Sequence, residues 1–355
     1  SWWALVVFTA TLLLYAALSP RVEQRLDPVT GDEPFYMMTA HNILAGRGLD
    51  ETASWAKADY QQEFYPRLPL PAGWQGWDTY PLVIPPHDSK GTIPPGLYSK
   101  HGLGVSLLIL PLYALGKRAA IVLFLNLIGA LVAANVFLLA LEASGKTWIA
   151  LVVWLAFSFS VPLMPYAYLI FPEIFAALFV VYAFRRIRAP VNNGWQTAGI
   201  GVGIALLPWL HARFVPIALA LCAYWFWQHF WQARRLLWIS ALPLLAPTIS
   251  AAALLDFYFY FYGTFLPNAQ DHGGTSDMPG FLNGSAGLLL DQQWGLLIAA
   301  PAYVLALAAA LAAARSAVWG PGTGAARWAA GVVVPYLALI AGYSVWWGEW
   351  CPPAR

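Results

Sequence analysis

Long apolar runs separated by short polar segments make up most of this chain. A membrane-spanning helix needs about 20 mostly apolar residues, and somewhat fewer where aromatic residues flank it. By this measure the pattern predicts nine spans, near residues 2–18, 119–141, 147–165, 168–184, 196–210, 214–230, 236–256, 294–314 and 328–346. We therefore expect an all-α fold, a polytopic bundle of about nine transmembrane helices.

One further apolar stretch, residues 102–116, is short and contains Pro111. Counting it as a full span would send every later cluster of basic residues to the outer side of the membrane, against the usual bias of Lys and Arg. We therefore predict a re-entrant or interfacial helix on the outer side. This choice leaves Lys117 and Arg118 as an exception to the charge rule.

Basic residues in the short loops set the predicted orientation, because Lys and Arg gather in cytoplasmic loops. With a cytoplasmic N-terminus, four basic clusters fall inside: Lys146, the "RRIR" of 185–188, Arg234 with Arg235, and Arg315 with Arg327. Residues 19–118 then form a long first outer loop with interfacial helices, and residues 257–293 form a second outer loop. The predicted location is the cell membrane of the cell envelope, with an extracytoplasmic active face.

Composition agrees with a membrane protein and argues against two classes of function. The chain is 60% hydrophobic and 10% charged, far from the make-up of soluble domains. A net charge of +2 without a basic stripe predicts no nucleic-acid partner. Cys222 and Cys351 form no CxxC pair, which predicts neither a disulfide framework nor a thiolate metal site. We treat residues 1–355 as one transmembrane domain and expect the protein to continue beyond both ends.

Acidic residues predicted on the outer side are the first candidates for chemistry. Asp32 and Glu33 follow the first span and precede a helix-like run. Asp32 could simply cap that helix, with Pro34 in its first turn. Glu173, in "YLIFPEIF", lies at the apolar outer end of a span, where a carboxylate is costly unless it meets water, a cation or another partner. A functional role is therefore the favoured interpretation of Glu173.

A few basic residues predicted on the outer side are the candidate ligands for an anion. They are Lys100 and His101 in "YSKHGLG", His211 and Arg213 in "WLHARF", and Arg355 in "CPPAR". Arg213 lies between two apolar runs, so its guanidinium needs an anionic partner or the headgroup region. Snorkelling toward headgroups and binding of a phosphate through paired donors both fit this position.

Taken together, these motifs resemble the GT-C class of membrane glycosyltransferases. The shared features are an Asp-Glu pair after the first span, a long outer loop leading to a K-H-G-L-G turn, an acidic residue at a later outer junction, and an Arg at another. The pattern is similar to bacterial relatives of the protein O-mannosyltransferases and the aminoarabinose lipid A transferases. The segments "DQQWGLLIAAPAYVLAL" (291–307) and "WWGEWCPPAR" (346–355) also resemble bacterial members. The junction "YAYLIFPE" (166–173) departs from the Arg-containing form common in the mannosyltransferases.

The resemblance implies transfer of a sugar from a polyprenyl-phosphate donor to an acceptor at the outer face. It implies that Asp32 acts at the acceptor, with Glu33 as a supporting carboxylate, and that Lys100 contacts the donor phosphate. The further candidates for substrate binding are His101, Glu173, His211, Arg213 and Arg355. The cofactor is unknown; a divalent metal is one alternative, with Asp32 and Glu173 as its candidate ligands.

The residues suit this reaction on chemical grounds as well, because transfer needs a base for the acceptor proton and cations for the departing phosphate. Asp32 could supply the first, and Lys100, Arg213 or a metal the second. A non-catalytic GT-C-like subunit, which assembles with partner membrane subunits or binds membrane lipids, is the alternative. An active enzyme should direct Asp32 into a cavity that Glu173 shares, within roughly 10 Å, about one Debye length. A scaffold should leave Asp32 capping its helix.

Overall fold

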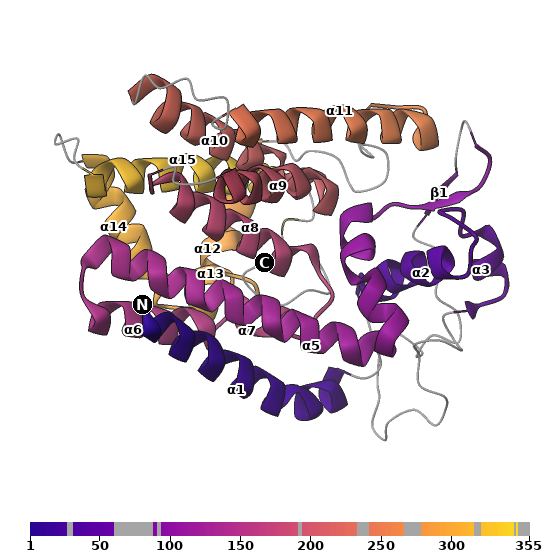
Figure 1. Cartoon of the computed structure of the whole chain (residues 1–355), viewed down its shortest axis with the longest axis horizontal. Coiled ribbons are helices and arrows are strands. Elements are labelled where there is room, and N and C mark those ends of the chain that lie inside the picture. Colours follow the sequence, from indigo (N-terminus) through magenta and orange to yellow (C-terminus); the bar gives the residue numbers. More distant parts are fainter. Residues whose placement is uncertain are drawn as a thin grey trace.

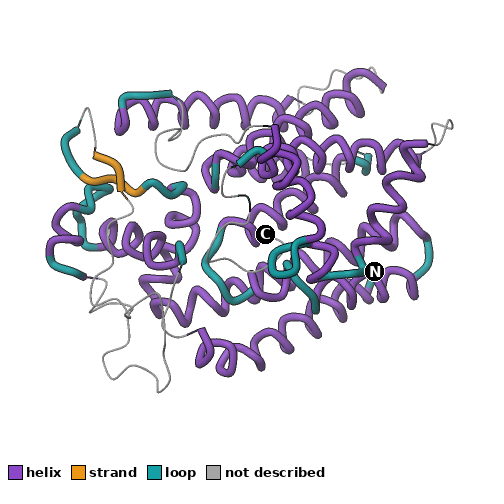
Figure 2. The backbone as a smooth tube through the Cα atoms, turned by 180° about the vertical axis from the view of Figure 1, so that it is seen from behind, coloured by secondary structure: helices purple, strands orange, loops and turns teal. Residues whose placement is uncertain are grey.

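The computed structural model describes residues 1–26, 31–59, 88–90, 94–190, 194–232, 241–265, 278–315, 321–343 and 346. These residues are overwhelmingly helical, which confirms the predicted all-α class. Within the described ranges, the strands are β1 (Asp88–Lys90) and β2 (Leu97–Ser99), which pair antiparallel with Asp88 opposite Ser99. Figure 2 shows how little of the backbone outside the helices belongs to strands.

Four helices of the described chain are long and apolar enough to cross a membrane. They lie in α1 (Trp2–Leu26), α5 (Leu103–Ser144), α11 (Leu242–Tyr262) and α15 (Pro321–Ala341). These four coincide with the predicted spans at 2–18, 119–141, 236–256 and 328–346. A membrane protein is therefore supported by helix length and composition, and nine spans remain a prediction.

The other five predicted spans fall on shorter helices. Proline accounts for several of the breaks, since it removes a backbone donor and cannot continue a helix without a kink. Pro162 lies between the helices Thr147–Ser158 and Leu163–Tyr166, and Pro172 begins the helix that follows them. These helices are α6 (Thr147–Ser158), α7 (Leu163–Tyr166), α8 (Pro172–Ile187), α9 (Gly194–Leu210), α10 (Val215–Phe226) with a π-helical turn (Trp227–Gln232), α13 (Leu296–Ala299) and α14 (Tyr303–Arg315). Helix α12 (Met278–Leu290) lies instead within the predicted second outer loop.

Helix α5 is the central element of the first half of the chain. It packs against α1, α6 and α8, and Figure 1 shows α1 lying alongside it. Its backbone leaves helical geometry at Gly116 and Lys117, and Lys117 has a φ of 52°. Two arms, residues 103–115 and 118–144, result from this kink. The longer arm measures about 40 Å at 1.5 Å per residue, enough to cross a hydrocarbon core of about 30 Å. The break agrees with the predicted separation of 102–116 from the following span.

Short elements of the predicted first outer loop gather at one end of the molecule. They are α2 (Glu33–Leu44), α3 (Thr52–Ala56) and the β1–β2 pair, at the right of Figure 1, away from the N-terminus. Helix α2 packs on α5, and its Tyr36 and Met37 belong to the main apolar core. At the other predicted outer loop, α11 continues to Tyr262, so residues 257–262 are helical rather than part of a loop.

Candidate functional site

Asp32 occupies the N-cap position of α2, yet its side chain makes no capping hydrogen bond. Its backbone carbonyl accepts hydrogen bonds from the N–H groups of Phe35 (3.2 Å) and Tyr36 (3.4 Å). Pro34 fits the first turn, where a missing N–H leaves no intrahelical bond unmade. Backbone hydrogen bonds thus close the first turn of α2, and the interpretation of the Asp32 carboxylate as the helix cap is wrong.

Glu33 is anchored by a buried ion pair that sequence reasoning missed. Arg118 donates from Nε to Oε2 (3.1 Å) and from a terminal nitrogen to Oε2 (3.0 Å) and Oε1 (3.3 Å). The Glu33 side chain is 2% exposed and that of Arg118 12% exposed. The same arginine nitrogen donates to the carbonyl oxygen of Tyr168 (3.2 Å). Arg118 directly follows the kink of α5, which places its guanidinium against Glu33.

Glu173 and Arg213 form a second ion pair between the starts of two helical segments. Glu173 lies in the first turn of α8 after Pro172, and Arg213 lies in the 3-10 turn Ala212–Phe214. Both side chains are nearly buried, at 12% and 11% exposed. His211 caps this turn, since its Nδ1 accepts from the Arg213 backbone N–H at 3.1 Å. Arg213 is therefore the cation that the Glu173 carboxylate needs, and Glu173 is the anionic partner that the Arg213 guanidinium needs.

Two other predicted motifs lie in direct contact. A Cβ added at Gly102 would lie 2.3 Å from the carbonyl oxygen of Leu210, and one at Gly104 would lie 2.8 Å from Trp209. The "KHGLG" turn therefore needs glycine there to pack against the end of α9, directly before His211. On its other side, the His101 ring stacks on Phe35 with centroids 5.2 Å apart. The turn that carries Lys100 and His101 thus lies between α2 and the "WLHARF" segment.

The segment from Tyr168 to Glu173 links the two ion pairs. Arg118, bound to Glu33, holds the Tyr168 carbonyl, and Glu173 follows five residues later. A chain of five residues reaches at most about 17 Å when fully extended. The structure thus brings the Asp32–Glu33 end of α2 and the Glu173 junction to one region. The closer distance between Asp32 and Glu173, and the cavity they would share, remain predictions.

The remaining candidates are Lys100, Arg355 and a metal site. Lys100 lies half-buried in the bend after β2, and its contact with a donor phosphate remains a prediction. Arg355 lies outside the described residues. Across the described ranges, no three His, Cys, Asp or Glu side chains lie together as a metal site would require. The Glu173 carboxylate is paired with the Arg213 guanidinium, and its predicted role as a metal ligand beside Asp32 stays a prediction.

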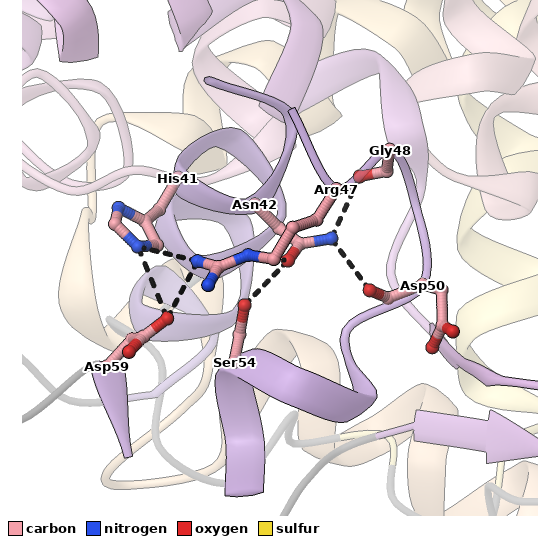
Figure 3. Close-up of polar contacts among 7 residues, drawn as sticks. All are labelled: His41, Asn42, Arg47, Gly48, Asp50, Ser54 and Asp59. Atoms are coloured by element: carbon pink, nitrogen blue, oxygen red, sulfur yellow. Dashed lines mark hydrogen bonds and ion pairs between the residues drawn. The ribbon is translucent and has the colours of Figure 1, made fainter. Parts of the chain in front are cut away.

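A polar network around Asn42 is a further feature that the sequence did not reveal (Figure 3). The buried Asn42 amide donates to the carbonyl oxygens of Gly48 and Asp50, both at 2.9 Å. Its oxygen accepts from Ser54 Oγ at 2.6 Å and Arg47 Nε at 3.0 Å, so every donor and lone pair of the amide is used. The network fixes the chain between α2 and α3.

Arg47 and Asp50 extend this network in two directions. Arg47 bonds Asp59 at 2.7 Å and His41 at 3.1 Å. Asp50 Oδ1 accepts from the backbone N–H groups of Thr52 (3.0 Å) and Leu97 (3.1 Å). Burial alone would raise the pKa of Asp50, but the hydrogen bonds from Thr52 and Leu97 outweigh it and lower that pKa below the usual value of an aspartate. This carboxylate therefore ties the α2–α3 connection to β2.

Comparisons of the chain with protein-family models, with curated proteins and with solved structures find no match.

Proposed function

We propose that this chain is a GT-C-type glycosyltransferase that moves a sugar from a polyprenyl-phosphate donor to an acceptor at the extracytoplasmic face of the membrane. The observation that carries the proposal is the contrast between two neighbouring carboxylates. Glu33 is buried and bound by Arg118, whereas Asp32, one residue earlier at the start of the helix, is only half-buried. Adjacent acids with such different surroundings suit two roles, one structural and one chemical.

Asp32 is the proposed general base. Its carboxylate takes the proton of the acceptor hydroxyl, the acceptor oxygen bonds to the anomeric carbon, and the bond from that carbon to the phosphate oxygen breaks. Polyprenyl phosphate leaves with the electron pair. The Glu33–Arg118 pair supports this step by fixing the start of α2, because catalysis requires the base to be held within a fraction of an ångström of its productive position.

Lys100 is the proposed cation for the departing phosphate. It lies on the turn that packs between α2 and the end of α9, next to His101. Arg213 is a weaker candidate than the sequence indicated, because Glu173 offsets its charge. We assign Arg213 mainly to positioning, through its pair with Glu173 and its backbone bond to His211. Stabilising charge on the leaving group is usually the larger part of such catalysis.

Sugar transfer by the purified protein in liposomes tests the proposal. The assay follows a radiolabelled sugar from its polyprenyl-phosphate donor to membrane acceptors, for the wild type, Asp32→Asn and Asp256→Asn. Asp256 lies on an exposed face of α11 and serves as the matched control. We expect Asp32→Asn to reduce transfer by roughly 10²- to 10⁴-fold, the usual contribution of a positioned base, and Asp256→Asn to leave it unchanged.

Two results would oppose the proposal. Retention of activity by Asp32→Asn within a few-fold would dismiss Asp32 as the base. Absence of transfer by a folded wild type, whatever the donor sugar, would favour the alternative of a non-catalytic subunit with an assembly or lipid-binding role.

A further inference from the structure

The last turns of α5 and α8 and the π-helical turn after α10 meet at one end of the molecule. Arg185 of α8 pairs with Glu142 of α5 at 3.0 Å. The carbonyl oxygen of Ile187, also in the last turn of α8, lies 3.1 Å from Nε2 of His229 in the π-helical turn. In Figure 1 the N-terminus and α6 lie toward this end, and α2, α3 and β1 lie toward the opposite one. These contacts fix together turns that are far apart in the sequence.

Basic side chains dominate this end of the molecule. Lys146 is the N-cap of α6, Arg185 and Arg186 lie in the last turn of α8, and Arg188 is its C-cap; we call these four residues the basic end. Glu142 offsets one of the four positive charges. Among the residues that the structure describes, Lys146, Arg186 and Arg188 form no ion pair. The negative end of the α8 dipole supplies only about half an elementary charge, so most of this positive charge is left to an outside anion.

The arginines of the basic end are held against the helices. Arg185 is 12% exposed, and Arg186 and Arg188 are half-buried. Arg188 lies close enough to the buried Tyr224 of α10 to act electrostatically on its hydroxyl. A half-buried guanidinium is poorly screened by water, so it attracts an anion more strongly than a fully solvated one does. Guanidinium groups also match phosphate oxygens with paired hydrogen-bond donors.

Exposed tryptophans place the basic end at the membrane surface. Trp148 lies in the first turn of α6, Trp195 in the first turn of α9 and Trp231 in the π-helical turn, and they are 64%, 88% and 64% exposed. Tryptophan favours the headgroup level of a membrane. Four and seven residues after Trp148, on the same face of α6, the exposed Val152 and Leu155 offer an apolar surface. Positive charge thus lies at headgroup depth, with apolar surface beside it.

We propose that the basic end binds the headgroup phosphate of an anionic phospholipid, whose acyl chains lie along the exposed apolar face of α6. The predicted topology makes this the cytoplasmic leaflet, where basic pockets between transmembrane helices suit anionic lipids. A free phosphate would use the charge of the basic end but not the apolar face, and a zwitterionic lipid would use the apolar face but bring no net charge. This inference is independent of the proposed sugar transfer, since Asp32 lies at the start of α2, toward the other end of the molecule.

Displacement of dansyl-labelled phosphatidylglycerol from the purified protein in neutral-detergent micelles tests this site, with energy transfer from tryptophan as the signal. The competitors are unlabelled phosphatidylglycerol, phosphatidylcholine with the same acyl chains, and inorganic phosphate. We expect phosphatidylglycerol to compete about tenfold better than phosphatidylcholine, and millimolar phosphate not to compete. The preference for phosphatidylglycerol should shrink several-fold between about 0.05 and 0.5 M salt, because the Debye length falls.

Variants assign the binding to the basic end. Arg188→Gln should lower the preference for phosphatidylglycerol about fivefold, and Arg186→Gln/Arg188→Gln should nearly abolish it, because each basic residue near an anionic surface contributes about fivefold. Lys57→Gln is the matched control, since it removes one exposed positive charge at the end of α3 and should leave the preference unchanged.

Three results would each overturn the proposal: equal competition by the two lipids for the folded wild type, an unchanged preference in the double variant, or an equal loss in Arg188→Gln and Lys57→Gln. Displacement of the labelled lipid by millimolar phosphate would overturn the lipid as the partner and assign the basic end to a free phosphate. Where a variant does not fold, the wild type still decides, because a lipid preference that does not change with salt would contradict binding through charge.

Discussion

Replacing Arg118 by Met should destabilise the fold more than any loss of a surface charge. The substitution keeps a long apolar side chain but removes three hydrogen bonds to Glu33 and one to the Tyr168 carbonyl. It leaves the Glu33 carboxylate 2% exposed and without its cation. Breaking a buried ion pair from one side typically costs about 3–5 kcal/mol, because the remaining charge is neither hydrated nor paired. The ratio of folded to unfolded protein should fall by roughly a hundredfold to several thousandfold.

Arg185→Met is the matched control for this substitution. Arg185 pairs with Glu142 at 3.0 Å, but Glu142 is 42% exposed and regains water when its partner is lost. Exposed pairs contribute about 0–1 kcal/mol, so this variant should stay close to the wild type. The double variant Glu33→Gln/Arg118→Met leaves no buried charge and should recover much of the stability lost in Arg118→Met.

Equilibrium unfolding in mixed micelles, followed by the fluorescence of the 19 tryptophans, gives the free energy of unfolding for each variant. A cost for Arg118→Met no larger than that for Arg185→Met would refute the reasoning. So would a double variant as unstable as the sum of its single substitutions, since the pair would then have no coupling.

Three further predictions test other contacts. Arg213→Ala should lower the free energy of unfolding by roughly 3–5 kcal/mol in the same assay, because the two nearly buried charges pair. Adding Glu173→Gln to this variant should restore part of the lost stability. A change in donor binding alone, with stability unaltered, would return Arg213 to the role of phosphate ligand. In a variant without Cys222 and Cys351, a cysteine at position 100 should react with a membrane-impermeant maleimide from the outer face, and a cysteine at position 146 should react only from the cytoplasm. The opposite labelling would reverse the predicted topology. The lowered pKa of Asp50 means that its contribution to stability is complete above pH about 4 and is lost as pH falls through that lowered pKa. The protection factor of the Leu97 amide, the factor by which its exchange is slower than that of an unstructured chain at the same pH, should fall in that acid range, and Thr52→Ala should move the onset of the fall to higher pH. A protection factor independent of pH would contradict the contact.

The fold class could be predicted from the sequence because apolar runs of span length have few alternatives. The break between 102–116 and the next helix was also predicted, from the charge rule and the shortness of the apolar run; Pro111, the other reason for it, lies inside the helix, and the backbone breaks at Gly116 and Lys117 instead. The lengths of individual helices were less predictable. Proline near Ser158 and before Glu173 shortens the helices there, while hydropathy continues across the break.

The site was predictable as separate pieces but not as pairs. Glu173 and Arg213 each signalled the need for a partner, because each is a charge at the end of an apolar run. Nothing in the local sequence joins Glu33 to Arg118, which is 85 residues away and was interpreted only as an exception to the charge rule.

A structure of the Asp32→Asn variant with a polyprenyl-phosphate sugar bound would test the proposed function most directly. The account predicts the phosphate beside Lys100 and the anomeric carbon facing residue 32. A donor bound on the opposite side of the helices from residue 32, or residue 32 in open solvent with no ligand beside it, would contradict it.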